Sequence, residues 1–230
     1  MLTGAEWAVI GLSLKVSLVA VLATLPVAYG LAWLLARRRF PGRLLLDAAV
    51  HLPLVLPPVV TGWLLLLLFG RAGPVGGWLE AQWGVGLVFR WTGAALAAAV
   101  MALPLMVRAM RLSIEAVDRR LVEAARVLGA SPARAFATIT LPLSAPGIAA
   151  GAVLGFARSL GEFGATITFA SNIEGETRTL PLAIYTGLQL PGAEGAVARL
   201  AVIAILLSLG ALLASEWLVR RSMGQRAHVL

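Results

Sequence analysis

The sequence predicts an all-α fold, a polytopic bundle of about five membrane-spanning helices that forms one domain over residues 1–230. Of these residues, 60% are hydrophobic and only 13% are charged, whereas soluble domains carry roughly a quarter charged residues. Apolar runs long enough to cross a bilayer recur along the chain, and arginines stand between them. The mean hydropathy of +0.89 also indicates an integral membrane protein.

Five ranges are apolar enough to span a membrane. We expect these spans near residues 7–35, 44–69, 92–107, 143–169 and 196–219. Pro53, Pro57 and Pro58 predict a kink or a break in the second, because proline lacks an N–H and crowds the preceding turn. Outside the spans, short helices are expected around residues 78–83 and 180–190.

The basic residues predict the orientation of the chain. Most of the 19 Lys and Arg residues fall within residues 37–43, 108–134 and 220–226, between or after the spans. Short loops rich in these residues are typical of the cytoplasmic side. We therefore expect a multi-pass protein of the cell (inner) membrane, with its N-terminus outside and its C-terminus in the cytoplasm. Because the positive charges serve this topology, no nucleic-acid partner is expected.

The longest polar segment, residues 123–142, contains a helix–break–helix pattern. Residues 123–128 are good helix formers, and Gly129 follows where a helix end favours a left-handed residue. Ser131-Pro132 is typical of an N-cap followed by proline at the first helical position. We expect Leu141-Pro142 to end this second helix. From the pattern alone, a docking element for a soluble partner and a hairpin that caps the bundle are equally open.

The same segment resembles the EAA motif of binding-protein-dependent ABC transporter permeases. That motif is E-A-A, three residues, G, nine residues, then I-x-L-P, and the matching residues are Glu123, Ala124, Ala125, Gly129, Ile139, Leu141 and Pro142. In that family the segment, residues 115–142 here, forms coupling helices that sit in a cleft of the ATPase. The resemblance implies that Gly129 permits the elbow, while Ala124 and Ala125 allow close approach. Glu123 would pair with a basic group of the ATPase or cap a local helix.

Three further stretches are similar to the molybdate permeases of this family. They are HLPLVLPPVVTG (51–62), AVMALPLMVRAMR (99–111) and FARSLGEFGATITFASNIEGETRT (156–179). The similarity covers essentially the whole chain and implies a type I importer permease that moves molybdate inward by alternating access. Permeases for tungstate or sulfate are close relatives and remain alternatives. A passive channel or secondary carrier is an alternative from another class, but it would not need a partner-docking elbow.

The resemblance also implies the partners: a second copy of the chain in a homodimer, two ABC ATPase subunits, an extracytoplasmic molybdate-binding protein and the lipid bilayer. We expect no enzymatic activity on this chain. A Walker A loop needs Gly-Lys-Ser/Thr, whereas Lys15, the only lysine, follows Leu14 inside a span. There it should snorkel or face the protein interior. ATP and Mg would bind the partner ATPase, and with no cysteine and two histidines no cofactor or metal site is expected here.

Candidates for a gate or pathway lie within the spans, and each has a structural alternative. These candidates are Pro57, Pro58, Thr61, Ser159, Glu162 and Thr166. A carboxylate at membrane depth indicates either a functional site or a paired structural group. For Glu162 we favour a pair, with Arg158 one turn earlier or with His51 across the bundle. The hydroxyls would donate to a passing oxyanion or, more commonly, bond their own helix backbone.

Small residues recur at every fourth position of the fourth predicted span. They are Gly147, Gly151, Gly155 and Ser159. Residues four apart share one face of a helix. We therefore expect a ridge of small residues that lets another helix pack closely in lipid.

Overall fold

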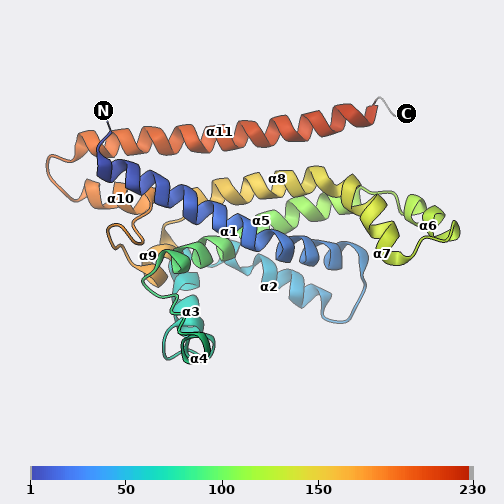
Figure 1. The fold of residues 1–230 in the computed structure, drawn as a ribbon, viewed down its shortest axis with the longest axis horizontal. Helices are drawn as coiled ribbons and strands as arrows, with labels where there is room; N and C mark the ends of the chain where they lie inside the picture. Colours follow the sequence, from blue (N-terminus) through green and yellow to red (C-terminus); the bar gives the residue numbers. More distant parts are fainter. Residues whose placement is uncertain (1, 228–230) are drawn as a thin grey trace.

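The computed structural model describes residues 2–227, and every regular element within them is helical. Four long helices run along the long axis of the molecule (Figure 1): α1 (Gly4–Arg37), α5 (Trp91–Glu115), α8 (Leu141–Leu160) and α11 (Glu194–Ala227). Helices α1, α5 and α11 are each long and apolar enough to cross a membrane. Helix α8 meets the same criterion when the helical residues before it are included, over Pro132–Leu160. The described residues thus hold four candidate spans, or five if a bent helix pair counts as one.

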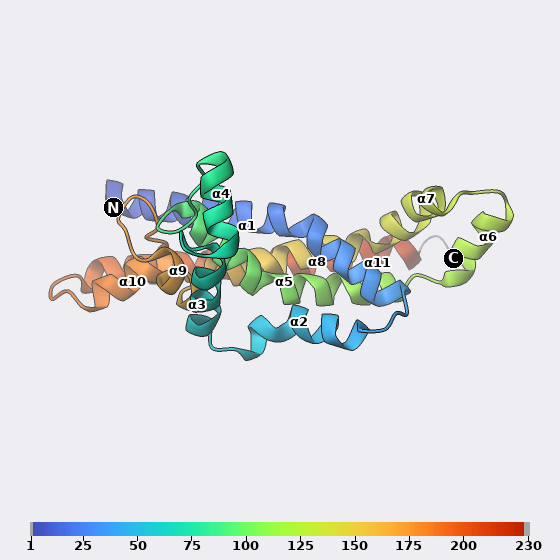
Figure 2. The same cartoon turned by 90° about the horizontal axis from the view of Figure 1, so that it is seen from below.

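Shorter helices complete the chain. They are α2 (Arg43–Val55), α3 (Pro58–Phe69), α4 (Pro74–Trp83), α6 (Arg119–Val127), α7 (Pro132–Ala135), a π-helical turn (Phe136–Thr140), α9 (Gly164–Ala170) and α10 (Leu180–Leu188). Helices α4 and α10 confirm the two short helices expected outside the spans. Helices α6 and α7 lie at one end of the bundle, and α1 begins at the other (Figures 1 and 2). Helices α3 and α4 run across the long axis (Figure 2).

The second predicted span is not one helix. Helix α2 ends at Val55, α3 begins at Pro58, and the two meet at a bend of 118°. This confirms the predicted break, and Pro57 between them has a non-helical ψ of 133°. Pro58 restarts the helix at its first position, where the missing N–H is not needed. Pro53, in contrast, stays inside α2.

The third and fourth predicted spans have different limits in the structure. Helix α5 continues past residue 107 to Glu115, because the charged residues that end the apolar run do not end the helix. Arg111 there bonds Glu115 one turn later, with Nε 2.9 Å from Oε1. The expectation of one helix over residues 143–169 is wrong, since α8 ends at Leu160 and α9 begins at Gly164. The predicted ranges 7–35 and 196–219 lie inside α1 and α11.

The prediction that Leu141-Pro142 ends the second helix of the elbow is wrong. The helix runs without interruption from Pro132 to Leu160. In the π turn the Leu141 N–H bonds the Phe136 carbonyl, five residues back. This wide turn comes just before Pro142 and accommodates it, because proline has no N–H and crowds the carbonyl four residues earlier in a regular α-helix.

The predicted ridge of small residues on α8 is confirmed. All four of its members are buried. A Cβ atom added at Gly147 would lie 2.2 Å from the Cβ of Ser113 on α5, and one at Gly155 would lie 2.6 Å from Met106 Sδ. Helix α8 therefore approaches α5 more closely than larger residues would allow. Such packing stabilises helix pairs in lipid, where burial of apolar surface does not.

Lys15 in α1 is directed at another helix. Its Nζ lies 3.7 Å from the centroid of the Trp91 ring at the start of α5. The face of an aromatic ring attracts a cation electrostatically. The contact therefore gives this charge a partner within the bundle.

Candidate functional site

Helices α6 and α7 form an elbow at one end of the bundle (Figure 1). The Asp118 carboxylate caps α6 by accepting the Arg120 N–H at 2.9 Å. Gly129 has a φ of +89°, the left-handed conformation that the sequence predicts and that glycine adopts without steric cost. Ser131 caps α7 by accepting the Arg134 N–H at 3.2 Å. Local signals in the sequence therefore shape the elbow.

The tip of the elbow is apolar and uncovered. Helix α6 buries no residue. Val127 and Leu128 at its end are each 87% exposed. Leu121, two turns earlier, is 49% exposed. Exposed apolar side chains grouped at such a tip are typical of a protein contact site, which favours the docking element over the capping hairpin.

The residues of the E-A-A…G…I-x-L-P motif differ in exposure. Those exposed to solvent are Glu123, Ala124, Gly129, Leu141 and Pro142, and those half-buried are Ala125 and Ile139. Glu123 lines a pocket of about 330 Å³ between α6 and the end of α1. Within residues 2–227 its carboxylate makes no hydrogen bond or ion pair, so the expected local cap is not formed. Its pairing with a basic group of a partner stays a prediction.

Sequence reasoning missed the residues that tie the elbow to the bundle. Phe136, in the π turn, packs edge-on against Tyr29 and Trp33 of α1, with ring centroids 6.1 and 6.0 Å apart. The Tyr29 hydroxyl lies 2.8 Å from Ser144 Oγ on α8. These contacts connect the elbow to both α1 and α8. The only signal in the sequence was a pair of aromatic residues one turn apart near the end of the first span.

Helix α3 crosses α9 close to the two helix breaks. A Cβ atom added at Gly62 would lie 2.7 Å from the Ala165 carbonyl oxygen, and one at Gly164 would lie 2.7 Å from Pro58 Cβ. The two glycines therefore bring the backbones into contact. The candidates from two predicted spans lie on the elements around this crossing: Pro57, Pro58 and Thr61 at the start of α3, Ser159 at the end of α8, Glu162 in the break after it, and Thr166 on α9.

Glu162 is buried and paired at this crossing. It is 3% exposed, and its Oε2 lies 2.7 Å from Arg158 Nη1. Its Oε1 accepts the Ala165 N–H at 2.8 Å, a bond that helps α9 to start anew and so explains the break after α8. The structural pair with Arg158 is thus confirmed. The alternative pair with His51 is wrong, since His51 Nδ1 lies 3.3 Å from Asp47 Oδ1 on its own helix.

Two buried hydroxyls in this region have no hydrogen-bond partner in the part of the chain described. They belong to Thr61 and Ser159, each 5% exposed. Thr168, in contrast, donates to the Gly164 carbonyl at 2.9 Å, the more common behaviour of a hydroxyl in a helix. An unsatisfied buried polar group costs about 1–3 kcal/mol. Both hydroxyls therefore remain candidates for a gate or pathway.

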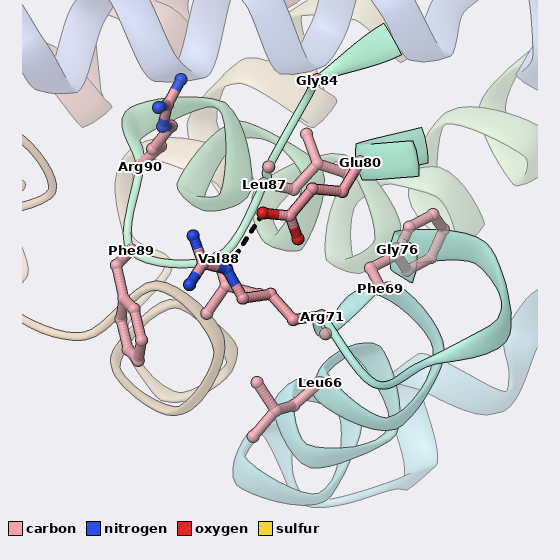
Figure 3. Close-up of a pocket in the computed structure, with 12 residues that line it drawn as sticks. Leu66, Phe69, Arg71, Gly76, Glu80, Gly84, Leu87, Val88, Phe89 and Arg90 are labelled. Atoms are coloured by element: carbon pink, nitrogen blue, oxygen red, sulfur yellow. Dashed lines mark ion pairs between the residues drawn. The ribbon is translucent and has the colours of Figure 1, made fainter. Parts of the chain in front are cut away.

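A pocket lies outside this crossing. It has a volume of about 500 Å³ and lies among α3, α4 and residues 84–90 (Figure 3). Arg71 Nε lies 3.2 Å from Glu80 Oε1, and Arg90 points away from that pair (Figure 3). The pocket thus offers no converging positive charges of the kind that bind an oxyanion strongly. Nor do residues 2–227 hold three His, Cys, Asp or Glu side chains placed to bind a metal ion.

A charged network that sequence reasoning missed joins α2 to α5. Arg111 Nη1 lies 3.1 Å from Asp47 Oδ2, and Arg111 Nε lies 2.9 Å from Glu115 Oε1. His51 extends the network from the Asp47 side. Nothing in the sequence shows that these two helices pack together, so the ion pair between Arg111 and Asp47 could not be predicted.

Residues 28–223 match the family model described as "binding-protein-dependent transport system inner membrane component". The chain belongs to this family. The match includes the whole elbow and the crossing of α3 and α9, and it confirms the resemblance drawn from the E-A-A motif. With its apolar helices, this permease is a multi-pass inner-membrane protein.

Two relatives of the permease are similar over nearly the whole length. It is 60% identical over 222 residues to the molybdenum transport system permease protein ModB of Escherichia coli strain K12, which covers 96% of this chain and 97% of that protein. The ModB of Haemophilus influenzae is 58% identical over 216 residues, 94% of each chain. The sulfate transport system permease protein CysT of E. coli K12 is 42% identical over 159 residues, which cover 69% of this chain and 57% of the CysT chain.

Solved structures confirm the fold of a type I ABC importer permease. A chain of a bacterial ABC transporter for the polysaccharide alginate superposes with a TM-score of 0.69 at 20% identity, over 96% of this permease and 80% of that chain. An amino acid ABC transporter gives a TM-score of 0.63 at 19% identity, over 94% of each chain. At such identities the likeness concerns the fold alone.

Proposed function

We propose that this permease is the membrane-spanning subunit of an ATP-driven importer that moves molybdate into the cytoplasm. The observation that carries the coupling role is the elbow at Gly129, whose exposed apolar tip fits a soluble partner. The substrate is proposed because the molybdenum permeases are similar over almost the full chain. Sulfate and tungstate are the alternative oxyanions, and the sulfate permease is similar over a smaller part.

The partners proposed for the permease follow from its uncovered surfaces. Helices α2 and α3 expose a broad apolar face, with Leu44 and Val55 each 82% exposed, which a second copy of the chain would cover in a homodimer. Each copy presents one elbow, so two ATPase subunits would bind, and they would carry ATP and Mg. An extracytoplasmic molybdate-binding protein would deliver the anion at the opposite end. In this orientation the N-terminus is outside and the C-terminus is cytoplasmic.

The proposed mechanism is alternating access. ATP binding closes the two ATPase subunits and displaces the elbows, and the contacts of Phe136 with Tyr29 and Trp33 carry that displacement into α1. The spans then tilt, the outer side opens, and hydrolysis resets them. Such a cycle requires each ligand to bind the two states unequally. The chain itself performs no catalysis and converts motion of the ATPase into motion of a gate.

The crossing of α3 and α9 is the proposed place where the anion passes. Thr61 and Ser159 hold hydroxyls without a partner, and these would donate to an oxyanion. The negative charge of Glu162 is paired with Arg158, which lowers its repulsion of an anion. The helices are interrupted around Pro57-Pro58 and Gly161–Gly164. In transporters, interrupted helices often border the substrate path, which supports this placement.

The test is the ATPase activity of the permease co-purified with its ATPase in lipid, with the binding protein loaded with different anions. We expect the molybdate-loaded binding protein to stimulate ATPase activity, and the binding protein incubated with phosphate to leave it unchanged. If only the sulfate-loaded binding protein stimulates ATPase activity, the transported anion is sulfate and not molybdate. If the ATPase does not co-purify and transport proceeds without ATP, the passive carrier is correct instead.

A further inference from the structure

A pocket with an excess of positive charge lies where α1 ends beneath the elbow. It has a volume of about 330 Å³ and is enclosed by the last turn of α1, by α6 and by the π turn. Its charged lining residues are Arg37, Arg38, Arg119, Arg126 and Glu123. Four positive charges face one negative charge, so the lining carries an excess of three positive charges. This pocket shares no lining residue with the crossing of α3 and α9, and it lies on the side of α6 that carries Arg119, Glu123 and Arg126.

The four arginines lack carboxylate partners. Elsewhere in the described chain Arg71, Arg111, Arg158, Arg178 and Arg199 each lie within 4 Å of an Asp or Glu oxygen. No such pair forms in the pocket among residues 2–227. Guanidinium groups that line one pocket without a paired carboxylate favour an oxyanion, which accepts several N–H bonds at once.

Contacts with neutral groups hold two of these arginines in place. Arg37 Nη2 donates to the carbonyls of Ile114 and Val117 at 2.8 and 2.9 Å. The Arg38 guanidinium lies over the Trp33 ring, 5.4 Å from its centroid. Neither contact neutralises the charge. The side chains are therefore already ordered in the absence of a ligand, which reduces the entropy lost when one binds.

The depth of the pocket indicates the source of the oxyanion. Trp33 lines it one turn before the spanning helix α1 ends at Arg37, and tryptophan rings prefer the boundary between lipid and water. Phe136 adds a second apolar wall. Basic pockets between helices at this level bind anionic headgroups. We propose that the pocket binds the phosphate of an anionic phospholipid in the leaflet at the elbow end of the bundle.

The test compares two double variants that remove equal charge from the same segment. Arg119→Gln/Arg126→Gln removes two lining residues, whereas Arg120→Gln/Arg134→Gln removes two that do not line the pocket. Each full-length protein is purified with phosphatidylglycerol and with phosphatidylcholine, and bound lipid is counted by native mass spectrometry. We expect the first variant to bind phosphatidylglycerol about thirtyfold more weakly, since two arginines are lost. The second should match the unmodified chain, and unchanged melting temperatures of both variants would exclude misfolding.

Two results would overturn the proposal. One is equal retention of phosphatidylglycerol by both variants, or equal retention of the two lipids by the unmodified chain. The other result comes from an experiment in which inorganic phosphate competes with the lipid for the pocket. Binding of free phosphate that depends on Arg119 and Arg126, without any preference for phosphatidylglycerol, would assign the pocket to a soluble anion. The experiment needs neither molybdate nor the ATPase, so its outcome is independent of the proposed transport function.

Discussion

The guanidinium of Arg158 lies 2.7 Å from the carboxylate of Glu162, across the break that separates α8 from α9. The Glu162 side chain is 2% exposed and that of Arg158 is 25% exposed. Because the second carboxylate oxygen accepts the Ala165 N–H, one residue joins the end of one helix to the start of the next. The side chain of Glu162 thus links the two helices where the helical hydrogen bonding of the backbone is interrupted.

We expect Glu162→Gln to lower the free energy of unfolding by about 2 kcal/mol, because Arg158 loses its counter-charge while an acceptor for Ala165 remains. Arg158→Gln should cost more, since it leaves a buried carboxylate unpaired. The double variant should cost less than the sum of the two, as expected for residues in contact. Thermal unfolding in detergent measures all three, with the exposed Glu174→Gln as a nearly neutral control. Additive costs would show that the pair contributes no coupling.

Gly129→Val should uncouple the permease from its ATPase. A Cβ atom at this position meets nothing within 4 Å, so the effect comes from the φ of +89°, which a β-branched residue adopts only at a cost of about 1–2 kcal/mol. We expect co-purification of the ATPase and transport to fall roughly tenfold, while the melting temperature falls by only a few degrees. Gly210→Val is the control, because it also has open space but lies inside α11. Full transport by Gly129→Val would favour the passive carrier.

Val127→Ser/Leu128→Ser should weaken ATPase binding without affecting the fold. Both side chains are 87% exposed, so the free chain loses almost no packing. If a partner buries them, each contributes about 1.5 kcal/mol or more, which predicts roughly hundredfold weaker binding for the pair. Affinity measured in nanodiscs checks this. The matched control is Leu188→Ser/Leu190→Ser on exposed leucines of α10 and the loop after it, and equal weakening by both variants would refute a specific contact at the tip.

Thr61→Val should reduce molybdate uptake while leaving stability unchanged or slightly higher. The hydroxyl has no hydrogen-bond partner within the described chain, so its removal abolishes an unsatisfied buried group and deprives the path of a donor. Ser159→Ala should behave in the same way. Thr168→Val gives the contrast, because its hydroxyl bonds Gly164 and its loss should cost about 1 kcal/mol. Uptake that is unaffected by Thr61→Val would remove this residue from the path.

Long-range packing explains why several expectations failed. Pro142 is tolerated because a π turn precedes it, and Phe136 within that turn packs on α1. Glu123 lines a pocket with arginines that include Arg37 of α1 instead of capping its own helix. Neither outcome can be derived from neighbouring residues, because each depends on a helix that lies far away in the sequence.

The sequence by itself determined the helical membrane class, the approximate positions of the spans and the elbow. These features depend on hydropathy over about twenty residues and on backbone preferences at Gly129 and Ser131, which act locally. Only the tertiary structure decided that α3 crosses α9, that Glu162 pairs with Arg158 and not with His51, and that four arginines share one pocket. The rotation and contacts of a helix in lipid follow from its neighbours, so no single segment specifies which side chains of different helices meet.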